Sequence, residues 1–184
     1  MRLFIAIGLP EKIRAAISGL QKRLKSENII TAKFVEQDNL HFTLKFFGEV
    51  SETKLGKIKT TLQSTANIAK FGVSLAGLGA FPSNSNARVL FISTALGGEQ
   101  LKALQKSIDE KLAAVGFAPE KHYENHITIA RVKSVINTGE LNKLLKNKKL
   151  EFGTFTISGF SLMKSQLTPN GPVYETVKEF KLLE

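Results

Sequence analysis

Two short segments with the same pattern constrain the fold of this chain more than any other feature of its sequence. They are His41-Phe-Thr-Leu44 and His126-Ile-Thr-Ile129, and in both of them His and Thr alternate with apolar residues. Such alternation is typical of a strand with one buried face, because residues i and i+2 of a strand share a face. We therefore expect each histidine to stand beside its threonine, with the apolar residues packed in the core.

The elements expected around these strands also occur in a repeated order. Hydrophobic periodicity and turn residues predict β-α-β-α-β over residues 2–80 and again over residues 88–163, with one further strand at the end. A repeat of this length indicates two similar halves, since the units of solenoids are usually shorter. The first strand of each half precedes its histidine by 38 residues, as counted from Leu3 to His41 and from Arg88 to His126.

We therefore expect a single bilobal α+β domain over residues 1–184, with a pseudo-twofold relation between its halves (about 1–85 and 86–184) and a central cleft. After the first helix comes a segment that reads as a polar connection, and residues 81–86 have the composition of a surface loop. The expected strands are 2–8, 40–47, 71–80, 88–94, 126–132, 152–163 and 173–180, and the expected helices are 10–24, 51–68, 99–115 and 139–147.

Composition narrows the classes of function. The chain has no cysteine, which excludes disulfides, zinc–thiolate sites and thiol nucleophiles. Its net charge of +10 favours a polyanionic partner, of which nucleic acid is the commonest, although lysines spread over helix surfaces need no ligand. The apolar run at residues 2–7 is too short for a signal peptide core or a membrane span, so we expect a cytoplasmic protein.

The pair of histidines suits phosphoryl chemistry. One imidazole can deprotonate a nucleophile while the other protonates the leaving oxygen, and the threonine hydroxyls can bind the phosphate oxygens. This chemistry needs no metal or other cofactor, and no Asp or Glu stands at a ligand spacing beside His41 or His126. The alternative is that both histidines are ordinary strand residues. Their matching positions argue against it, whereas His122 has no counterpart in the first half and reads as a loop residue.

At this point the chain resembles a known family, the RNA 2′,3′-cyclic phosphodiesterases, also called 2′-5′ RNA ligases, of the two-histidine phosphoesterase superfamily. Nearly the whole chain takes part in the resemblance. One departure is Asn125, where the family often has proline before the second histidine. The matching segments are residues 2–7 with Leu9-Pro10, residues 39–50 around the first histidine, Phe81-Pro-Ser83, residues 126–131, and residues 162–174 with Ser165, Gly171-Pro172 and Tyr174.

The resemblance implies that antiparallel sheets line the cleft with helices outside, and that water opens a terminal 2′,3′-cyclic phosphate to leave a 2′-phosphate. By analogy, His126 is the base and His41 the acid, although the sequence alone does not assign these roles. Thr43 and Thr128 would hold phosphate oxygens, and Arg131 matches a family arginine that binds the phosphate. Regular alternation puts Arg131 on the face opposite His126, so it reaches the phosphate only if the strand twists, bulges or ends before it.

Other interpretations stay open at this stage. Regular alternation puts Phe47 on the His41 face, where it could stack on a base, but a core position fits it equally well. The same site could join a cyclic-phosphate end to a 5′-hydroxyl end as a 2′-5′ RNA ligase, and a basic protein of this kind could also bind RNA without chemistry. The expected partners are RNA ends, tRNA fragments among them, with no membrane and no second subunit.

Overall fold

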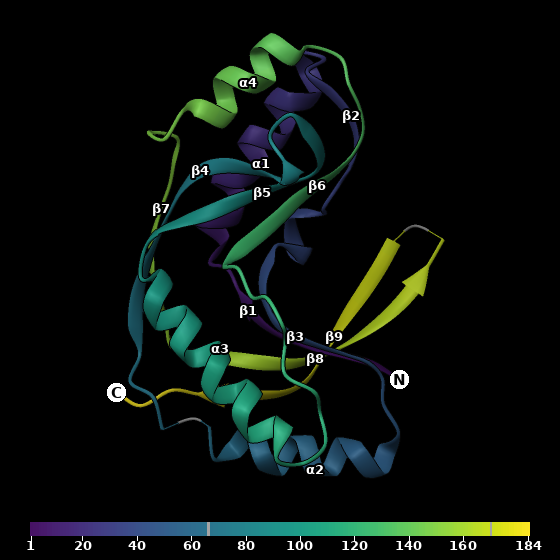
Figure 1. The fold of residues 1–184 in the computed structure, drawn as a ribbon, viewed down its shortest axis with the longest axis vertical. Helices are drawn as coiled ribbons and strands as arrows, with labels where there is room; N and C mark the ends of the chain where they lie inside the picture. Colours follow the sequence, from purple (N-terminus) through teal and green to yellow (C-terminus); the bar gives the residue numbers. More distant parts are fainter. Residues whose placement is uncertain (66, 170) are drawn as a thin grey trace.

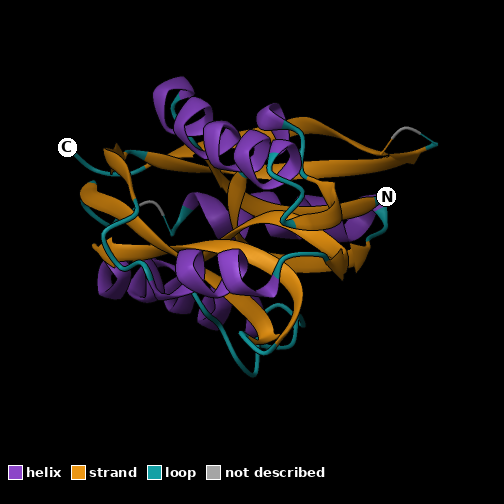
Figure 2. Ribbon diagram, turned by 90° about the horizontal axis from the view of Figure 1, so that it is seen from above, coloured by secondary structure: helices purple, strands orange, loops and turns teal. Residues whose placement is uncertain are grey.

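The computed structural model describes residues 1–65, 67–169 and 171–184. Its elements form two antiparallel sheets with helices on their outer sides, which confirms the expected α+β class (Figures 1 and 2). None of the helices in the described part of the chain is long and apolar enough to span a membrane. The helices are α1 (Glu11–Ser26), η1 (a 3-10 turn, Gln37–Asn39), α2 (Glu52–Gln63), α3 (Gly98–Ala113) and α4 (Thr138–Lys146).

The strands divide into a four-stranded sheet and a five-stranded sheet, and every strand pair within them is antiparallel. The four-stranded sheet has the order β3 (His41–Glu49), β1 (Arg2–Gly8), β8 (Gly159–Thr168) and β9 (Gly171–Lys181). The five-stranded sheet has the order β2 (Ile30–Phe34), β6 (His126–Val135), β5 (Asn86–Leu96), β4 (Phe71–Ser83) and β7 (Glu151–Ile157).

Each sheet takes strands from both halves of the sequence. β4, from the first half, pairs with β5 and β7, while β8 and β9, from the second half, extend the sheet that begins with β1 and β3. The helices are exchanged in the same way: α1 and α4 pack on the five-stranded sheet, and α2 and α3 on the four-stranded one (Figure 1). The two sheets therefore do not coincide with the two sequence halves, but each sheet contains one histidine strand.

The repeat holds at the level of single residues. The pairing of β1 with β3 and the pairing of β5 with β6 have the same register when 85 is added to each residue number, and both contain a bulge directly after the threonine. The extra residue of the bulge is Leu44 in β3 and Ile129 in β6. The matching pairs are Gly8 with His41 and Ser93 with His126, then Ala6 with Thr43 and Phe91 with Thr128.

The long helices bury the faces that their periodicity predicts. Apolar residues three and four apart share one face of a helix, and this face packs on the sheet. The buried residues are Ile13, Ile17, Leu20 and Leu24 of α1, and Leu101, Leu104, Ile108 and Leu112 of α3. From Ile17 onward the two sets match with an offset of 84, so the helices repeat as well as the strands.

Two expectations about strands were wrong. The segment after α1 is not only a polar connection but contains β2, a short outer strand in which apolar residues alternate with exposed Thr31 and Lys33. The alternation was present in the sequence, but it extends over only five residues. Residues 152–163 do not form one strand, because the chain leaves the five-stranded sheet after Ile157 and enters the four-stranded sheet at Gly159. Apolar residues are buried on both sides of this change, so the sequence pattern shows no break.

Several boundaries also differ from the expected ones, and two segments change most. Residues 81–86 are not a loop but the end of a hairpin, since β4 extends to Ser83 and β5 begins at Asn86. The helix expected over residues 51–68 ends at Gln63, because the N–H groups of Ser64 and Thr65 donate to carbonyls three residues earlier, which tightens its last turn. One residue of that expected range, residue 66, lies outside the described residues.

Candidate active site

His41 begins β3 and is held on both of its ring nitrogens. Its Nδ1 lies 2.7 Å from the carbonyl oxygen of Asn39, and its Nε2 lies 2.9 Å from Oγ1 of Thr43. The rings of Phe4 and Tyr174 pack against the imidazole, with centroid distances of 5.2 and 5.5 Å. Because a carbonyl only accepts hydrogen bonds, Nδ1 carries a hydrogen and Nε2 is the nitrogen that exchanges a proton.

His126 begins β6 and repeats this arrangement. Its Nδ1 lies 2.8 Å from the carbonyl oxygen of Glu124, again two residues earlier, and its ring packs against Phe81 and Phe91 at centroid distances of 5.2 and 5.7 Å. Its Nε2 makes no hydrogen bond to any described residue. Both histidines thus have the same tautomer fixed by the backbone, and both present Nε2 for proton transfer.

The two histidines lie close together although they belong to different sheets. Burial lowers the pKa of His41, the hydrogen bond to Asn39 raises it, and the positive charge of His126 lowers it further. The strands that begin with these histidines, β3 and β6, contact each other, which agrees with this charge effect. His41 is therefore mainly neutral near pH 7 in the free protein, since its ordinary pKa is 6.5.

The bulge in β6 brings Arg131 to the side of the sheet that carries His126. With Ile129 as an extra residue, the alternation shifts by one position, and Ala130 is buried while Arg131 is exposed. Burial raises the pKa of Tyr174, and the nearby charge of Arg131 acts against this rise. Since Tyr174 touches His41, Arg131 approaches the first histidine from the opposite sheet.

A buried amide supports this bulge. Nε2 of Gln21, on α1, donates to the carbonyl oxygens of Val35 (2.8 Å) and Ile129 (2.9 Å), and the backbone N–H of Val35 also donates to Ile129 (2.9 Å). The carbonyl of the extra residue has no partner in the β5–β6 ladder, so these donors satisfy it. Gln21, which the sequence did not single out, thus supports the bulge that precedes Arg131.

The two threonines differ in their hydrogen bonds. Thr43 is bonded to His41, whereas the hydroxyl of Thr128 has no partner among the described residues. Both are partly exposed beside their histidines, as alternation predicts. No group of three or more His, Asp or Glu side chains able to hold a metal ion occurs within the described residues.

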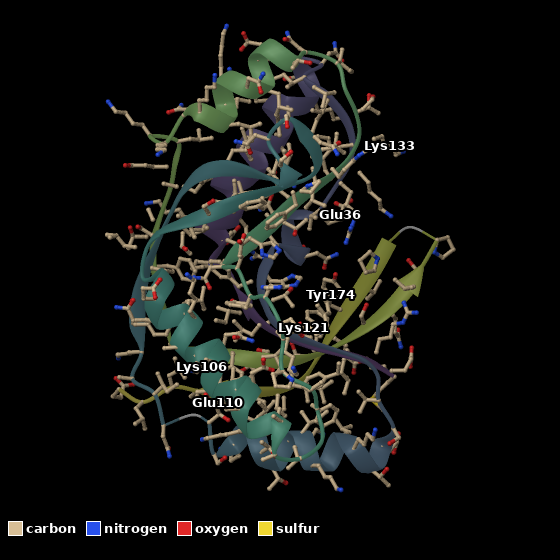
Figure 3. All side chains as sticks on the ribbon, viewed as in Figure 1. Glu36, Lys106, Glu110, Lys121, Lys133 and Tyr174 are labelled. Carbon is tan, nitrogen blue, oxygen red and sulfur yellow. The ribbon has the colours of Figure 1, made fainter. Side chains whose placement is uncertain are left out.

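Four aromatic residues around the histidines were also missed as parts of the site. Phe4, Phe81, Phe91 and Tyr174 come from four strands, and only the pairing of strands brings them to the imidazoles. Phe4, Phe81 and Tyr174 lie in segments that carry the family resemblance, which is the one signal that pointed to them, and Phe91 lies in none of these segments. Figure 3 labels Tyr174 where the β8–β9 hairpin joins the body of the molecule.

Three other residues that the sequence singled out, Phe47, His122 and Asn125, lie outside the pair of His-x-Thr segments. Phe47 is not on the His41 face, because the bulge at Leu44 turns it to the core, where it packs against Phe117 at 5.0 Å. His122 is exposed in the segment between α3 and β6, so its interpretation as a loop residue is confirmed. Asn125 donates from Nδ2 to the Gly98 carbonyl (2.7 Å) and so fastens the residue before His126 to the start of α3.

Comparison with known proteins agrees with this geometry. The pattern of the family described as LigT-like phosphoesterases matches residues 7–91 and 95–174. A Methanocaldococcus jannaschii protein described as an RNA 2′,3′-cyclic phosphodiesterase is 41% identical over 181 residues, which cover 98% of this chain and 100% of the relative. An Aquifex aeolicus protein of the same description is 34% identical over 187 residues, which cover 99% and 97% of the two chains.

Solved structures show the same fold. A Thermus thermophilus crystal structure has a TM-score of 0.80 and 31% identity, covering 99% of this chain and 98% of that one. The crystal structure of E. coli LigT with 3′-AMP has a TM-score of 0.78 and 24% identity, covering 100% and 98%. Two antiparallel sheets that each present a His-x-Thr strand define a two-histidine phosphoesterase. Within that class, this chain belongs to the LigT-like phosphoesterase family.

Proposed function

We propose that this protein is an RNA 2′,3′-cyclic phosphodiesterase, which hydrolyses a terminal 2′,3′-cyclic phosphate to a 2′-phosphate. The observation that carries the proposal is the matched pair of histidines, each with Nδ1 bonded to a backbone carbonyl, which leaves Nε2 as the nitrogen that exchanges a proton. Its relatives described as RNA 2′,3′-cyclic phosphodiesterases support the same substrate class. RNA is also the polyanion that a net charge of +10 attracts.

In the proposed reaction, a water oxygen attacks phosphorus and the bond from phosphorus to O3′ breaks. His126 takes a proton from the water, and His41 gives its Nε2 proton to O3′, which leaves as the 3′-hydroxyl. The free Nε2 of His126 in the unbound protein suits the base. Metal is not needed for either proton transfer, and positioned acid and base groups typically accelerate a reaction by about 10²–10⁴-fold each.

The bond between His41 and Thr43 fits the role of an acid. When His41 is neutral, its Nε2 accepts the Thr43 hydroxyl, and when it is protonated, its Nε2–H donates instead. Protonation therefore frees the Thr43 hydrogen for a phosphate oxygen. The lowered pKa opposes protonation in the free protein, but a bound phosphate anion raises it again, so we propose that substrate binding charges the acid.

Thr128 and Arg131 complete the proposed phosphate site. The hydroxyl of Thr128 is free to donate, and the guanidinium of Arg131 offers several donors to a phosphate that gains negative charge in the transition state. We further propose that residues 1–184 act as one monomeric unit, since the site takes one histidine from each sheet of the same chain. We propose the cytoplasm as its location, because RNA substrates are found in that compartment. Cleaved tRNA fragments with cyclic-phosphate ends are the substrates we would test first.

The test is an oligoribonucleotide with a 2′,3′-cyclic phosphate end, incubated with the protein in EDTA. We expect a 2′-phosphate product, and a loss of at least about 10²-fold in kcat/KM for His41→Ala and for His126→Ala. His122→Ala is the matched control, because this histidine is exposed outside the sheets. Adding RNA with a 5′-hydroxyl end reveals any joining of ends. Loss of all turnover in EDTA, or full activity in both alanine variants, would overturn the proposal.

A further inference from the structure

The hairpin of β8 and β9 extends beyond the rest of its sheet. β1 pairs with β8 only at Ser161–Ser165, whereas β8 and β9 remain paired out to Thr168 and Gly171. Figures 1 and 2 show this end of the hairpin projecting from the molecule in two perpendicular views. We call its described residues, 166–168 and 171–173, the arm. Asn39 fastens the arm near the first histidine, because its Nδ2 donates to the carbonyl oxygen of Pro172 (3.1 Å).

The two faces of the arm each carry one exposed apolar side chain. Leu167 pairs with Pro172 and follows Ser165, which pairs with Tyr174, so alternation puts Leu167 on the face that carries Tyr174. Val173 pairs with Gln166 and lies on the other face. Leu167 is 68% exposed and Val173 54% exposed. Only the face that carries Leu167 and Tyr174 is continuous with the candidate active site. A substitution of Leu167 therefore tests a role of this face, and a substitution of Val173 is the control.

A second exposed apolar residue lies on the active-site face of the same sheet. The bulge at Leu44 turns Phe46 to this face, where it is 67% exposed. Its ring lies 5.9 Å from that of Phe4, which in turn lies 4.9 Å from Tyr174 and 5.2 Å from His41. Phe4 itself is only 3% exposed and connects Phe46 to Tyr174 beneath the surface. We call Phe46, Tyr174 and Leu167 the apolar strip. Exposed apolar groups gathered on one face of a soluble protein commonly mark a binding surface.

The charges beside the strip indicate what it binds. Arg131 comes close to Tyr174 from the facing sheet, and it pairs across β6 and β2 with Lys33, so both cations lie on the same side of that sheet. A surface that offers aromatic and apolar side chains to bases, with cations for the phosphates beside them, suits single-stranded RNA. The net charge of +10 adds a long-range attraction.

We propose that the apolar strip binds the single-stranded nucleotides on the 5′ side of the cyclic-phosphate nucleotide. This inference rests on the proposed function and goes beyond it, because it makes an RNA strand, rather than a cyclic mononucleotide, the preferred substrate. The terminal phosphate lies between the two histidines, and the preceding bases run outward over Phe46 and the arm. Stacking of this kind tolerates any base, so the strip favours length over sequence.

The experiment compares kcat/KM for a 2′,3′-cyclic mononucleotide and for an oligoribonucleotide of about eight residues with the same terminal nucleotide. The ratio of the two values measures the contribution of the upstream strand. We expect a ratio well above one in the wild type, and a fall of about tenfold for Phe46→Ser, which corresponds to one stacked base. A fall of about tenfold is also expected for Leu167→Ser, which removes an apolar side chain that the bound strand would bury. Val173→Ser is the matched control, and its ratio should equal that of the wild type.

Binding provides a second measurement that does not depend on turnover. The affinity for a fluorescent oligoribonucleotide ending in a 2′-phosphate should fall about tenfold in Leu167→Ser and not in Val173→Ser. A wild-type kcat/KM ratio near one would overturn the proposal that the apolar strip binds upstream nucleotides. Equal effects of Leu167→Ser and Val173→Ser on this ratio and on binding would also overturn it. Both outcomes would leave the proposed function intact. If neither substrate is hydrolysed, the proposed function fails, and the binding measurement still decides whether the strip holds RNA.

Discussion

Gln21 provides a direct test of the bulge that orients Arg131. It is 7% exposed, and Gln21→Met keeps its length while removing both donors to Val35 and Ile129. The Ile129 carbonyl still accepts a hydrogen bond from the N–H of Val35 in this variant, which limits the loss of folding stability. At about 1 kcal/mol for each lost bond, we expect the free energy of unfolding to fall by about 2 kcal/mol. For a chain of this size, Tm falls by about 4–8 °C.

The chain contains its own control for this substitution. Gln105 occupies the equivalent place on α3, between Leu104 and Ile108 as Gln21 lies between Leu20 and Leu24, and it is 6% exposed. Its Nε2 is buried without a hydrogen-bond partner among the described residues. Gln105→Met therefore removes an unsatisfied amide and no bond, and we expect it to be neutral or slightly stabilising.

Thermal unfolding followed by circular dichroism, together with kcat/KM on a cyclic-phosphate substrate, checks both variants. We expect Gln21→Met to lower kcat/KM by about tenfold, because a shifted bulge misdirects a charge-assisted contact worth about 1.5 kcal/mol or more. Gln105→Met should retain full activity. Equal Tm changes in the two variants would refute the argument for the amide. A destabilised Gln21→Met with full activity would show that the position of Arg131 does not depend on it.

Three further predictions concern the surroundings of the histidines. Burial lowers the pKa of His41, so the limb of kcat/KM against pH that disappears in His41→Ala should lie below pH 6.5, and a limb above 6.5 would contradict its burial. Lys45→Met leaves Asp109 buried without its lysine, so denaturant titration should show a loss of about 3–5 kcal/mol, which the double variant with Asp109→Asn should partly restore. A Cβ at Gly79 overlaps the Phe91 ring that packs on His126, so Gly79→Ala should cost about 1–3 kcal/mol and lower kcat/KM, and unchanged values of both would show that the ring moves freely.

Most of the His-x-Thr arrangement could be predicted from the sequence because it is local. Alternation with a period of two puts a histidine and its threonine on one face, and it does not matter which strand lies alongside. The repeat then makes the two strands equivalent, and the register of β1–β3 and β5–β6 shows this equivalence residue by residue. That His41 and His126 approach each other was an inference from symmetry, and the effect of one charge on the pKa of the other supports it.

The exchange of strands between the sheets could not be predicted, because alternation does not encode the partner of a strand. β8 carries buried residues on one face whether it continues β7 or pairs with β1, and only packing selects β1. The arrangement of α1 over the five-stranded sheet follows from the same selection. The aromatic residues around each histidine depend on these pairings, so they remained outside the predicted site.

The bulges left a partial signal. A bulge buries two consecutive residues, which are Ile129 and Ala130 in β6 but Leu44 and Lys45 in β3. The first pair is apolar and could have been noticed. The second is concealed by a lysine, which is 3% exposed because it donates to Asp109 and to the Ala118 carbonyl. A buried charge of this kind depends on partners from distant segments, and no local pattern predicts it.

The repeat explains why the site has two equivalent histidines, but the proposed reaction needs them to differ. The backbone treats His41 and His126 alike, and the differences come from single substitutions at equivalent positions. Adding 85 to 46 gives 131, so the place of exposed Phe46 beside one histidine is taken by Arg131 beside the other. An RNA end is asymmetric in the same sense, with an anionic phosphate and an apolar base surface. A symmetric fold with an arginine on one side and a phenylalanine on the other can therefore bind such an end in one orientation, which fixes which histidine faces the water and which faces O3′ in the proposed reaction.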